Sequence, residues 1–328
     1  MKILAVDDDT FILELIPMIS AKVGFPDVTA VSSAQLALDE LKSSDVAFDC
    51  LLVDIQMPGM DGIELCRHVR ALSAYRKTPI IMLTAMTEKD YIDRAFKAGA
   101  TDYASKPFDM VELGARLRMA QQLVHARRDA AVTGGAGKEL SGPANPGQES
   151  GQSDDVRIDG IKNIIDYTAL GNYLMQLSRA GLAGSQVIAV KIDQIEAIGA
   201  RASAEEFVYA LTEVADAISD VLRSSGYMMA YAGNGAFVVI SGKPSVDPSI
   251  GLEIEIQNLL DEKGSEYDNG DPLDIEVSVG NPIRPNSSET QGDRQTFERA
   301  IARAETRAIK KQSEPRPVSF RFDSGEGR

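Results

Sequence analysis

The chain has 328 residues, of which 44% are hydrophobic and 25% charged, and its formal net charge is −15. This length suits about two domains of roughly 100–200 residues each, and no apolar run approaches the roughly 20 residues of a membrane-spanning helix. The acidic balance argues against a nucleic-acid-binding surface, which is normally basic, so we expect no nucleic-acid and no membrane partner.

The few cysteines and histidines, together with the N-terminal sequence, restrict the class of protein further. Cys50 and Cys66 lie in apolar contexts and are expected to be buried thiols rather than a disulfide. His68 and His125 are the only histidines, which argues against a histidine-based metal or catalytic site. The acidic residues that follow MKILAV do not suit a secretion signal. We therefore expect a cytoplasmic protein.

Apolar runs alternate with helical patterns through the first 126 residues. Runs of four or five apolar, β-branched-rich residues between helices are typical of buried parallel strands. This order predicts an α/β domain over residues 1–126, a (βα)5 doubly wound parallel sheet with helices on both faces. The expected strands are residues 2–6, 28–31, 50–53, 80–83 and 103–105, and the expected helices are residues 11–23, 34–41, 63–72, 89–98 and 110–125.

Residues 127–157 are expected to be a flexible linker. Their central part, residues 133–155, is rich in Gly, Ser and Pro and has almost no large apolar side chain. Such a segment cannot bury enough apolar surface to offset the entropy lost on ordering. A docking tail is the alternative interpretation.

Residues 158–328 show a second pattern of expected strands and helices. Asn234-Gly235 between two apolar runs is the strongest short hairpin signal. The order of elements predicts an α+β, ferredoxin-like domain with a βαββαβ core. Helices are expected near residues 161–179, 205–222, 250–260 and 294–311, and strands at residues 187–193, 227–231, 236–240, 275–279 and 318–322.

Polar side chains follow four of the strands expected in the first domain. They are Asp7 with Asp8, then Asp54, Thr84 and Lys106. The carboxyl ends of parallel strands share one edge of a sheet, and ligand sites form there. Grouped carboxylates suit Mg²⁺, which takes oxygen ligands, and a carboxylate can accept a phosphoryl group covalently. A lysine and a hydroxyl would complete a phosphoryl-transfer site.

Each of these residues also has a simpler interpretation. Asp8 or Asp9 suits a helix N-cap before FILELI. Asp54 could be a loop acid, Thr84 a helix cap and Lys106 a surface lysine. Their joint placement on one predicted edge favours a site.

The segments VDDD, VDIQMPGMDG, IIMLTA and AGATDYASKPF resemble the receiver domain of two-component response regulators. The resemblance implies that Asp54 is the phosphoacceptor, and that a histidine kinase or histidine phosphotransfer protein is its donor. It implies Mg²⁺ held by Asp8, Asp7, Asp54 and the backbone carbonyl of Gln56. Asp9 lies outside the family's acidic pair and is expected to be a cap.

The same resemblance implies a switch. Thr84 and Lys106 would bind the phosphoryl group, and Tyr103 would turn inward on activation. A cis peptide bond between Lys106 and Pro107 is also implied. The face made by the fourth helix, fifth strand and fifth helix (α4-β5-α5) would then support a homodimer. Its mixed charges suit cross-pairing, although ordinary solvated helix faces would look the same: Asp90, Arg94, Lys97, Glu112, Arg116 and Arg118.

The second domain resembles the GGDEF, or diguanylate cyclase, fold in segments such as VIAVKIDQIEAIGA, YAGNGAFVVI and RAETRAIKK. The resemblance places a run of five residues where Gly-Gly-Asp-Glu-Phe is expected, and both acids are missing. That run is Gly233, Asn234, Gly235, Ala236 and Phe237.

The resemblance also places Lys191 at the first metal-binding aspartate, and only Asp193 keeps its acid. Two-metal assistance needs such carboxylates, so we expect a catalytically inactive domain that acts through protein contacts or dimer geometry with an unknown partner. The alternatives are an active or conditionally active diguanylate cyclase, and a DNA-binding regulator, for which no helix-turn-helix pattern is seen. Lys191 holding a nucleotide phosphate is a further possibility.

Overall fold

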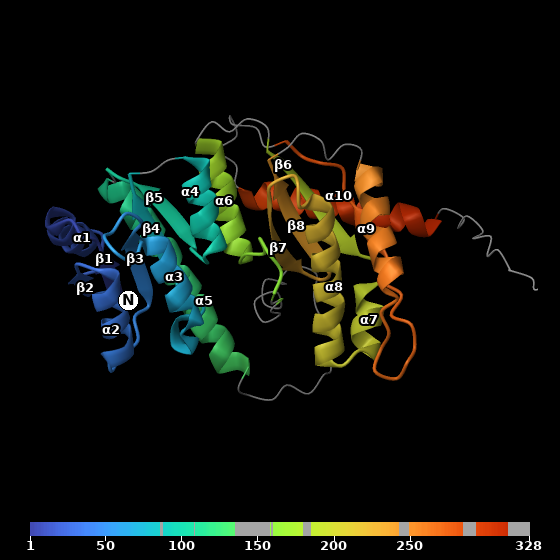
Figure 1. The fold of residues 1–328 in the computed structure, drawn as a ribbon, viewed down its shortest axis with the longest axis horizontal. Coiled ribbons are helices and arrows are strands. Elements are labelled where there is room, and N and C mark those ends of the chain that lie inside the picture. Colours follow the sequence, from blue (N-terminus) through green and yellow to red (C-terminus); the bar gives the residue numbers. More distant parts are fainter. Residues whose placement is uncertain are drawn as a thin grey trace, which may run out of the picture.

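The computed structural model describes residues 1–85, 88–107, 109–134, 158, 160–179, 185–242, 249–284 and 293–313. Two sheets lie side by side in this structure (Figure 1). The strand expected at residues 318–322 and most of the expected linker lie outside the described residues.

The first sheet is parallel and has the strand order β2-β1-β3-β4-β5. The central strand β3 is buried along its whole length, as its apolar sequence CLLVD predicts. The strands are β1 (Ile3–Val6), β2 (Val28–Val31), β3 (Cys50–Asp54), β4 (Ile80–Thr84) and β5 (Asp102–Ser105). The helices are α1 (Thr10–Lys22), α2 (Ala34–Ser43), α3 (Gly62–Ala71), α4 (Lys89–Lys97) and α5 (Met110–Gly134), with a 3-10 turn at Ser73–Tyr75.

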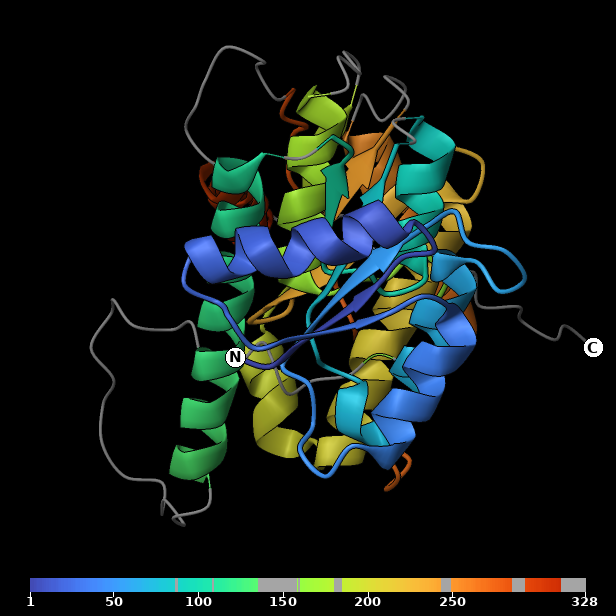
Figure 2. The same cartoon turned by 90° about the vertical axis from the view of Figure 1, so that its left-hand side faces the viewer.

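Alternate residues of these strands face opposite helical layers. Ile3 and Leu52 lie in a core with Leu113 and Leu117 of α5, whereas Leu4 and Leu51 lie in a second core with residues of α2, α3 and α4. Figure 2 views this unit with α1 in front of the strands. The predicted (βα)5 order is therefore observed, because each strand has apolar side chains for both faces.

The second sheet is antiparallel, with the order β7-β8-β6-β9. Apolar residues on one face pack against α8 and α9, and those on the other face pack against α6 and α10. The strands are β6 (Gln186–Ile192), β7 (Tyr227–Gly233), β8 (Ala236–Ser241) and β9 (Val277–Val279). The helices are α6 (Tyr167–Arg179), α7 (Ile195–Arg201), α8 (Ala204–Leu222), α9 (Ser249–Lys263) and α10 (Asp293–Ser313).

The helix expected over residues 161–179 is shorter than its sequence pattern predicts. Residues 163–165 instead run beside β7, where Ile165 N donates to Met229 O at 2.9 Å and Met229 N donates to Asn163 O at 2.9 Å. The pairing gives the edge strand β7 backbone partners. Asp166 then caps α6 by accepting a hydrogen bond from Thr168 N at 2.9 Å.

Helix α5 extends through residues 127–134, which the sequence places in the linker. Arg128 lies 2.5 Å from the Asp49 carboxylate, and Arg127 donates to the carbonyl of Lys77. These contacts join the last turns of the helix to loops at the amino ends of β3 and β4. Composition alone does not reveal such tertiary contacts.

Candidate phosphoryl-transfer site

Four strands of the first sheet bring the predicted site residues to one edge. Asp7 directly follows β1, Asp54 ends β3, Thr84 ends β4 and Lys106 directly follows β5. Since β1, β3, β4 and β5 are consecutive in the sheet, these positions are neighbours in space. Asp7, Asp54 and Thr84 are buried, and Lys106 is partly buried.

The acidic residues form a cluster with a lysine inside it. Carboxylate oxygens of Asp7, Asp8 and Asp54 lie within 4.8 Å of one another. Lys106 Nζ lies 2.6 Å from Asp7 Oδ2 and 2.8 Å from Asp54 Oδ1. The lysine therefore neutralises part of the charge of two buried carboxylates, and exposed Asp8 is open to an added cation.

Burial and the lysine have opposite effects on Asp54. Burial raises the pKa of Asp54, and the hydrogen bond and positive charge of Lys106 lower it without cancelling the increase. Burial lowers the pKa of Lys106, but the hydrogen bonds and negative charges of Asp54 and Asp7 outweigh this and raise it overall. The site therefore holds a buried carboxylate beside a protonated lysine.

Short local contacts fix the cluster. Asp9 caps α1 by accepting a hydrogen bond from Phe11 N at 2.8 Å, which confirms the predicted cap. Asp9 N in turn donates to Asp7 Oδ1 at 3.0 Å. After β3 the chain turns through Gln56, whose backbone N–H lowers the pKa of Asp54. It then enters α3 at Gly62, whose N donates to Ile55 O at 3.0 Å.

Thr84 and Tyr103 lie behind the cluster. Both side chains are buried, and burial raises the pKa of Tyr103 to about 12 while the Thr84 hydroxyl opposes that increase. Tyr103 packs in the same apolar core as Phe96 of α4. The peptide bond between Lys106 and Pro107 is cis, as the resemblance implied.

The charges expected to support a homodimer are partly used within the chain. Arg116 is 6% exposed and lies 2.6 Å from Asp102 and 2.8 Å from Glu112. Arg94 lies 3.7 Å from Asp61, and α6 of the second unit packs against α4 and β5. The expectation of cross-pairing between two copies is not retained, because this chain already covers part of that face.

Sequence reasoning missed the residues of α6 that make this contact. Asn172, Tyr173 and Gln176 lie at the surface of α4 and β5 and are buried. Amides four residues apart within the apolar stretch TALGNYLMQL are the signal that would have found them, because buried amides need hydrogen-bond partners.

The predicted hairpin of the second unit is formed by Gly233, Asn234, Gly235, Ala236 and Phe237. Asn234 and Gly235 both have positive φ, 47° and 68°, as a two-residue hairpin turn requires. Lys191 donates to the carbonyl of Asn234, and burial lowers the pKa of Lys191. Within the described residues, Asp7, Asp8 and Asp54 are the only group of three side chains with metal-ligand spacing.

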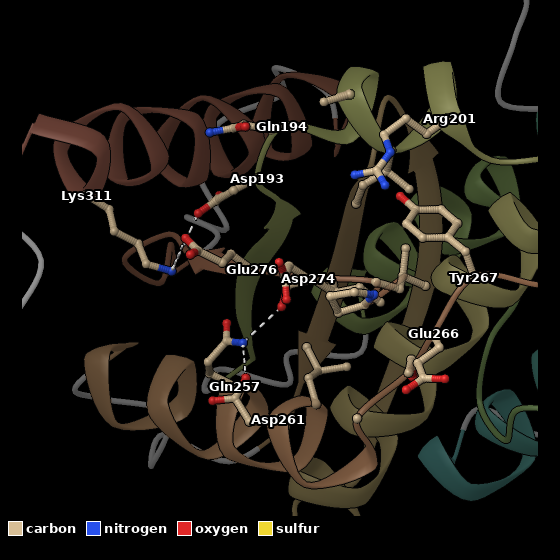
Figure 3. Close-up of a pocket in the computed structure, with 18 residues that line it drawn as sticks. Asp193, Gln194, Arg201, Gln257, Asp261, Glu266, Tyr267, Asp274, Glu276 and Lys311 are labelled. Carbon is tan, nitrogen blue, oxygen red and sulfur yellow. Dashed lines mark hydrogen bonds and ion pairs between the residues drawn. The ribbon is translucent and has the colours of Figure 1, made fainter. Parts of the chain in front are cut away.

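Asp193 belongs to a different set of contacts. Its Oδ2 accepts a hydrogen bond from Ser278 at 3.0 Å and lies 3.5 Å from Lys311 Nζ, which is 3.6 Å from Glu276. Burial raises the pKa of Asp193. Asp193, Glu276 and Lys311 line a cleft of about 1140 Å³ between α7, α9 and the loop before β9 (Figure 3). Asp193 therefore pairs with Lys311, whereas Lys191 bonds to the hairpin.

Comparison with known protein families agrees with the geometry of the first sheet. A family model described as the response regulator receiver domain matches residues 3–118. Residues 3–118 are a response regulator receiver domain. The five-stranded parallel sheet and its acidic edge belong to this domain, and the match does not extend to the second sheet.

Several curated proteins resemble the receiver domain. DNA-binding response regulator MtrA of Mycolicibacterium smegmatis is 38% identical over 117 residues, which are 36% of this chain and 49% of MtrA. Transcriptional regulatory protein ResD of Bacillus subtilis is 38% identical over 125 residues, 36% of this chain and 46% of ResD. The chain spans about half the length of the curated relatives it matches.

Two solved structures align with about a third of this chain. Chemotaxis protein CheY4 of Vibrio cholerae is 32% identical, with 36% of this chain and 97% of that chain covered and a TM-score of 0.34. The receiver domain DrrB in its BeF3-activated form is 28% identical, with 37% and 97% covered and a TM-score of 0.33.

The expectation of no nucleic-acid partner is wrong, because receiver relatives of this chain are named as DNA-binding response regulators. Net charge averages over the whole surface and does not decide what one output unit binds. Among the described residues, no helix has both the length and the apolar character needed to cross a membrane.

Proposed function

We propose that this chain is a two-component response regulator that accepts a phosphoryl group on Asp54 from a histidine kinase or a histidine phosphotransfer protein. The observation that carries the proposal is the position of Asp54 at the end of the central strand, 2.8 Å from Lys106 and grouped with Asp7 and Asp8. A buried nucleophile beside a fixed cation and an acidic pair is what phosphoryl transfer to a carboxylate requires.

In the proposed reaction, an Asp54 carboxylate oxygen forms a bond to phosphorus as the bond between phosphorus and the donor imidazole nitrogen breaks. The imidazole leaves with the electron pair and takes up a proton. Lys106 balances the added negative charge, and the Thr84 hydroxyl donates to a phosphoryl oxygen. Burial of Asp54 removes competing water from the nucleophile.

The donor set fits Mg²⁺ because it consists only of oxygen atoms within 4.8 Å of one another. Asp8, Asp7, Asp54 and the backbone carbonyl of Gln56 would hold the ion. When bound, the ion neutralises charge on the phosphoryl oxygens. Asp8 is exposed, whereas Asp7 and Asp54 are buried, so Asp8 is the carboxylate of this set that solvent reaches most readily.

Thr84 and Tyr103 are proposed to transmit the modification. Across β3 and β4, Asp54 pairs with Leu83, the residue before Thr84, and Thr84 itself pairs with Ser105 of β5. We expect the Thr84 hydroxyl to move toward a phosphoryl group, and the space that it vacates to let the Tyr103 ring change rotamer. Tyr103 is already 2% exposed in this structure, so the inward turn expected on activation is not retained.

Labelling by acetyl phosphate with Mg²⁺ tests the acceptor. Asp54→Asn is expected to lose essentially all covalent labelling, because the amide is a poor nucleophile, whereas the wild type gains about 80 Da, the mass of one phosphoryl group. Asp9→Asn is the matched control, since asparagine retains the N-cap and Asp9 is outside the cluster. Undiminished labelling of Asp54→Asn by intact mass spectrometry would contradict the assignment.

We infer that the second unit is a GGDEF-like, ferredoxin-like domain that is catalytically inactive and acts through protein contacts. Its strand order and its hairpin at residues 233–237 support the resemblance. The hairpin has no acidic side chain, and the amine of Lys191 donates a hydrogen bond to the backbone carbonyl of Asn234. A lysine at this position opposes binding of a cation.

Incubation with GTP and Mg²⁺ tests this inference. We expect no cyclic dinucleotide above the level of a heat-denatured sample, with or without phosphorylation of the receiver, when products are separated by liquid chromatography. Product formed only by the phosphorylated chain would establish the alternative, a conditionally active diguanylate cyclase.

A further inference from the structure

The second sheet has two edge strands, β7 and β9, and both have hydrogen-bond partners on their outer sides. An edge strand presents backbone N–H and C=O groups to which another chain can pair. At β7 the partner is backbone, because residues 163–165 bond to Met229 and Ile164 forms a parallel bridge with it. At β9 the partners are side chains.

The alternation of β9 determines which of its backbone groups face outward. Strand β9 pairs antiparallel with β6, and Glu276 O accepts a hydrogen bond from Asp193 N on that side. Successive residues of a strand direct their backbone groups to opposite sides. The backbone groups of Ile275, Val277 and Val279 therefore lie on the outer side.

The side-chain amide of Gln257, from α9, imitates a peptide group beside this edge. It accepts a hydrogen bond from Val277 N at 3.1 Å and donates one to Ile275 O at 2.9 Å. In a parallel ladder, one residue of the neighbouring strand makes this same pair of bonds to the residues that flank its partner. The second amide proton of Gln257 goes to Asp261 at 2.8 Å (Figure 3).

Two more side chains repeat the pattern further along β9. Lys311 Nζ donates to Val277 O at 3.2 Å, and Val279 N donates to Glu253 Oε2 at 2.9 Å. Glu253 is only 5% exposed, and Arg307 holds it in place through a contact of 2.7 Å. Three side chains thus make the four bonds that two residues of a parallel strand would make.

The geometry of α9 suits this arrangement. Residues four apart in a helix are separated by about 6 Å along its axis, and residues two apart in a strand by about 6.6 Å. Gln257 and Glu253 therefore reach the N–H groups of Val277 and Val279 together. Apolar residues of α9 pack in the core between α8, α9 and the sheet, so the helix has contacts that are independent of these bonds.

A second copy of this chain is the partner that the outer edge of β9 fits. The sequence Val277-Ser278-Val279 reads the same in both directions. Two copies related by a two-fold axis would pair antiparallel, with Val277 of one copy opposite Val279 of the other. The backbone groups that such pairing requires are the outward ones that the side chains now occupy.

We propose that Gln257, Glu253 and Lys311 form a side-chain closure of β9, which prevents a second copy of this chain from adding a strand to the second sheet. The closure is independent of phosphoryl transfer to Asp54. It acts by satisfying buried backbone groups within the chain, so that pairing between copies offers no hydrogen bonds that are not already made.

Light scattering and hydrogen exchange of the full chain test the closure. Glu253→Ala with Gln257→Ala removes three of the four bonds and opens space beside β9, and alanine favours the helix. Self-association is expected to be at least about tenfold stronger than in wild type. At low protein concentration the amides of Val277 and Val279 should exchange at least about tenfold faster than in wild type. They should become protected again as the copies associate.

Two control variants separate the closure from other effects. Glu255→Ala with Asn258→Ala also removes one acid and one amide from α9, but both side chains are exposed. This variant should match wild type in association and in exchange. Glu253→Gln keeps an oxygen that accepts from Val279 N and should also associate as wild type does, so loss of the charge alone has no effect.

Each result decides the proposal. A double variant that is folded by circular dichroism but associates and exchanges as wild type does would overturn it. Association that leaves the amides of Val277 and Val279 unprotected would overturn it too, because the contact would then lie elsewhere. If the double variant does not fold, Gln257→Ala alone is measured. Faster exchange at Val277 is expected, and unchanged exchange there would overturn the closure.

Discussion

Asp54 is the proposed phosphoacceptor, and its carboxyl group is buried beside a lysine. Lys106 provides the only described ion-pair contact to it, at 2.8 Å. Because burial outweighs this pairing, the pKa of Asp54 is raised from its ordinary value of 3.8. A carboxylate held in this way gains from an added cation, which offsets a charge that the fold isolates from water.

The raised pKa predicts a pH-dependent difference between wild type and Asp54→Asn. A carboxyl group whose pKa is raised on folding favours the folded state below pH 3.8, and that contribution is lost as the pH rises through the folded-state value. In metal-free buffer, the free energy of unfolding of Asp54→Asn relative to wild type should therefore increase between pH 4 and pH 7. Urea unfolding followed by circular dichroism at several pH values measures this difference in the free energy of unfolding. A difference that stays constant with pH would show that burial does not shift the pKa of Asp54.

At the scale of elements, the start of α3 positions the strand end that carries Asp54. A Cβ atom added to Gly62 would lie 2.0 Å from the carbonyl oxygen of Asp54, well inside contact distance. Gly59, in the turn before this helix, has φ of +80° but no atom within 4 Å of an added Cβ. The two glycines are therefore required for different reasons, the first for close packing and the second for backbone conformation.

This difference predicts that substituting alanine for Gly62 and for Gly59 will lower the free energy of unfolding by unequal amounts. Gly62→Ala should lower the free energy of unfolding by about 3 kcal/mol or more, because backbone must move to relieve the clash, and should reduce labelling of Asp54. Gly59→Ala should cost about 1 kcal/mol, the cost of positive φ for a residue with Cβ. Equal losses of the free energy of unfolding, measured with urea, would show that the contact of Gly62 with β3 relaxes without cost.

At the scale of the whole molecule, one apolar core crosses both sheets. Tyr103 and Phe96 of the receiver, Tyr173 and Leu174 of α6, and Phe297 of α10 belong to the same cluster. Such a shared core couples the unfolding of the two units, because neither buries these side chains alone.

Calorimetry of the full chain tests this coupling. Wild type should unfold in a single endotherm, and Asn172→Leu with Gln176→Leu should split it into two. Ser203→Ala, which removes the capping box of α8 inside the second unit, should cost about 1 kcal/mol and shift the single endotherm without splitting it. Two resolved transitions in wild type would show that the contact of α6 with the receiver contributes no cooperativity.

The receiver sheet and its acidic edge follow from short segments of the amino-acid sequence. Apolar runs of four or five residues predict its strands, and Asp7, Asp54, Thr84 and Lys106 each follow such a run, so parallel pairing alone brings them together. The Asn234-Gly235 turn was also predictable, because few residue pairs adopt positive φ at both positions. These features are local, and short segments of sequence encode them.

Other features could not be predicted from local sequence: the position of α6, the continuation of α5 through residues 127–134, and the pairing of residues 163–165 with β7. The same holds for the contacts of Lys106 with both Asp7 and Asp54, and for the pairing of Asp193 with Lys311. Each depends on contacts between residues distant in the chain. Local propensity does not encode such contacts, because their free energy exists only after the partners have been brought together.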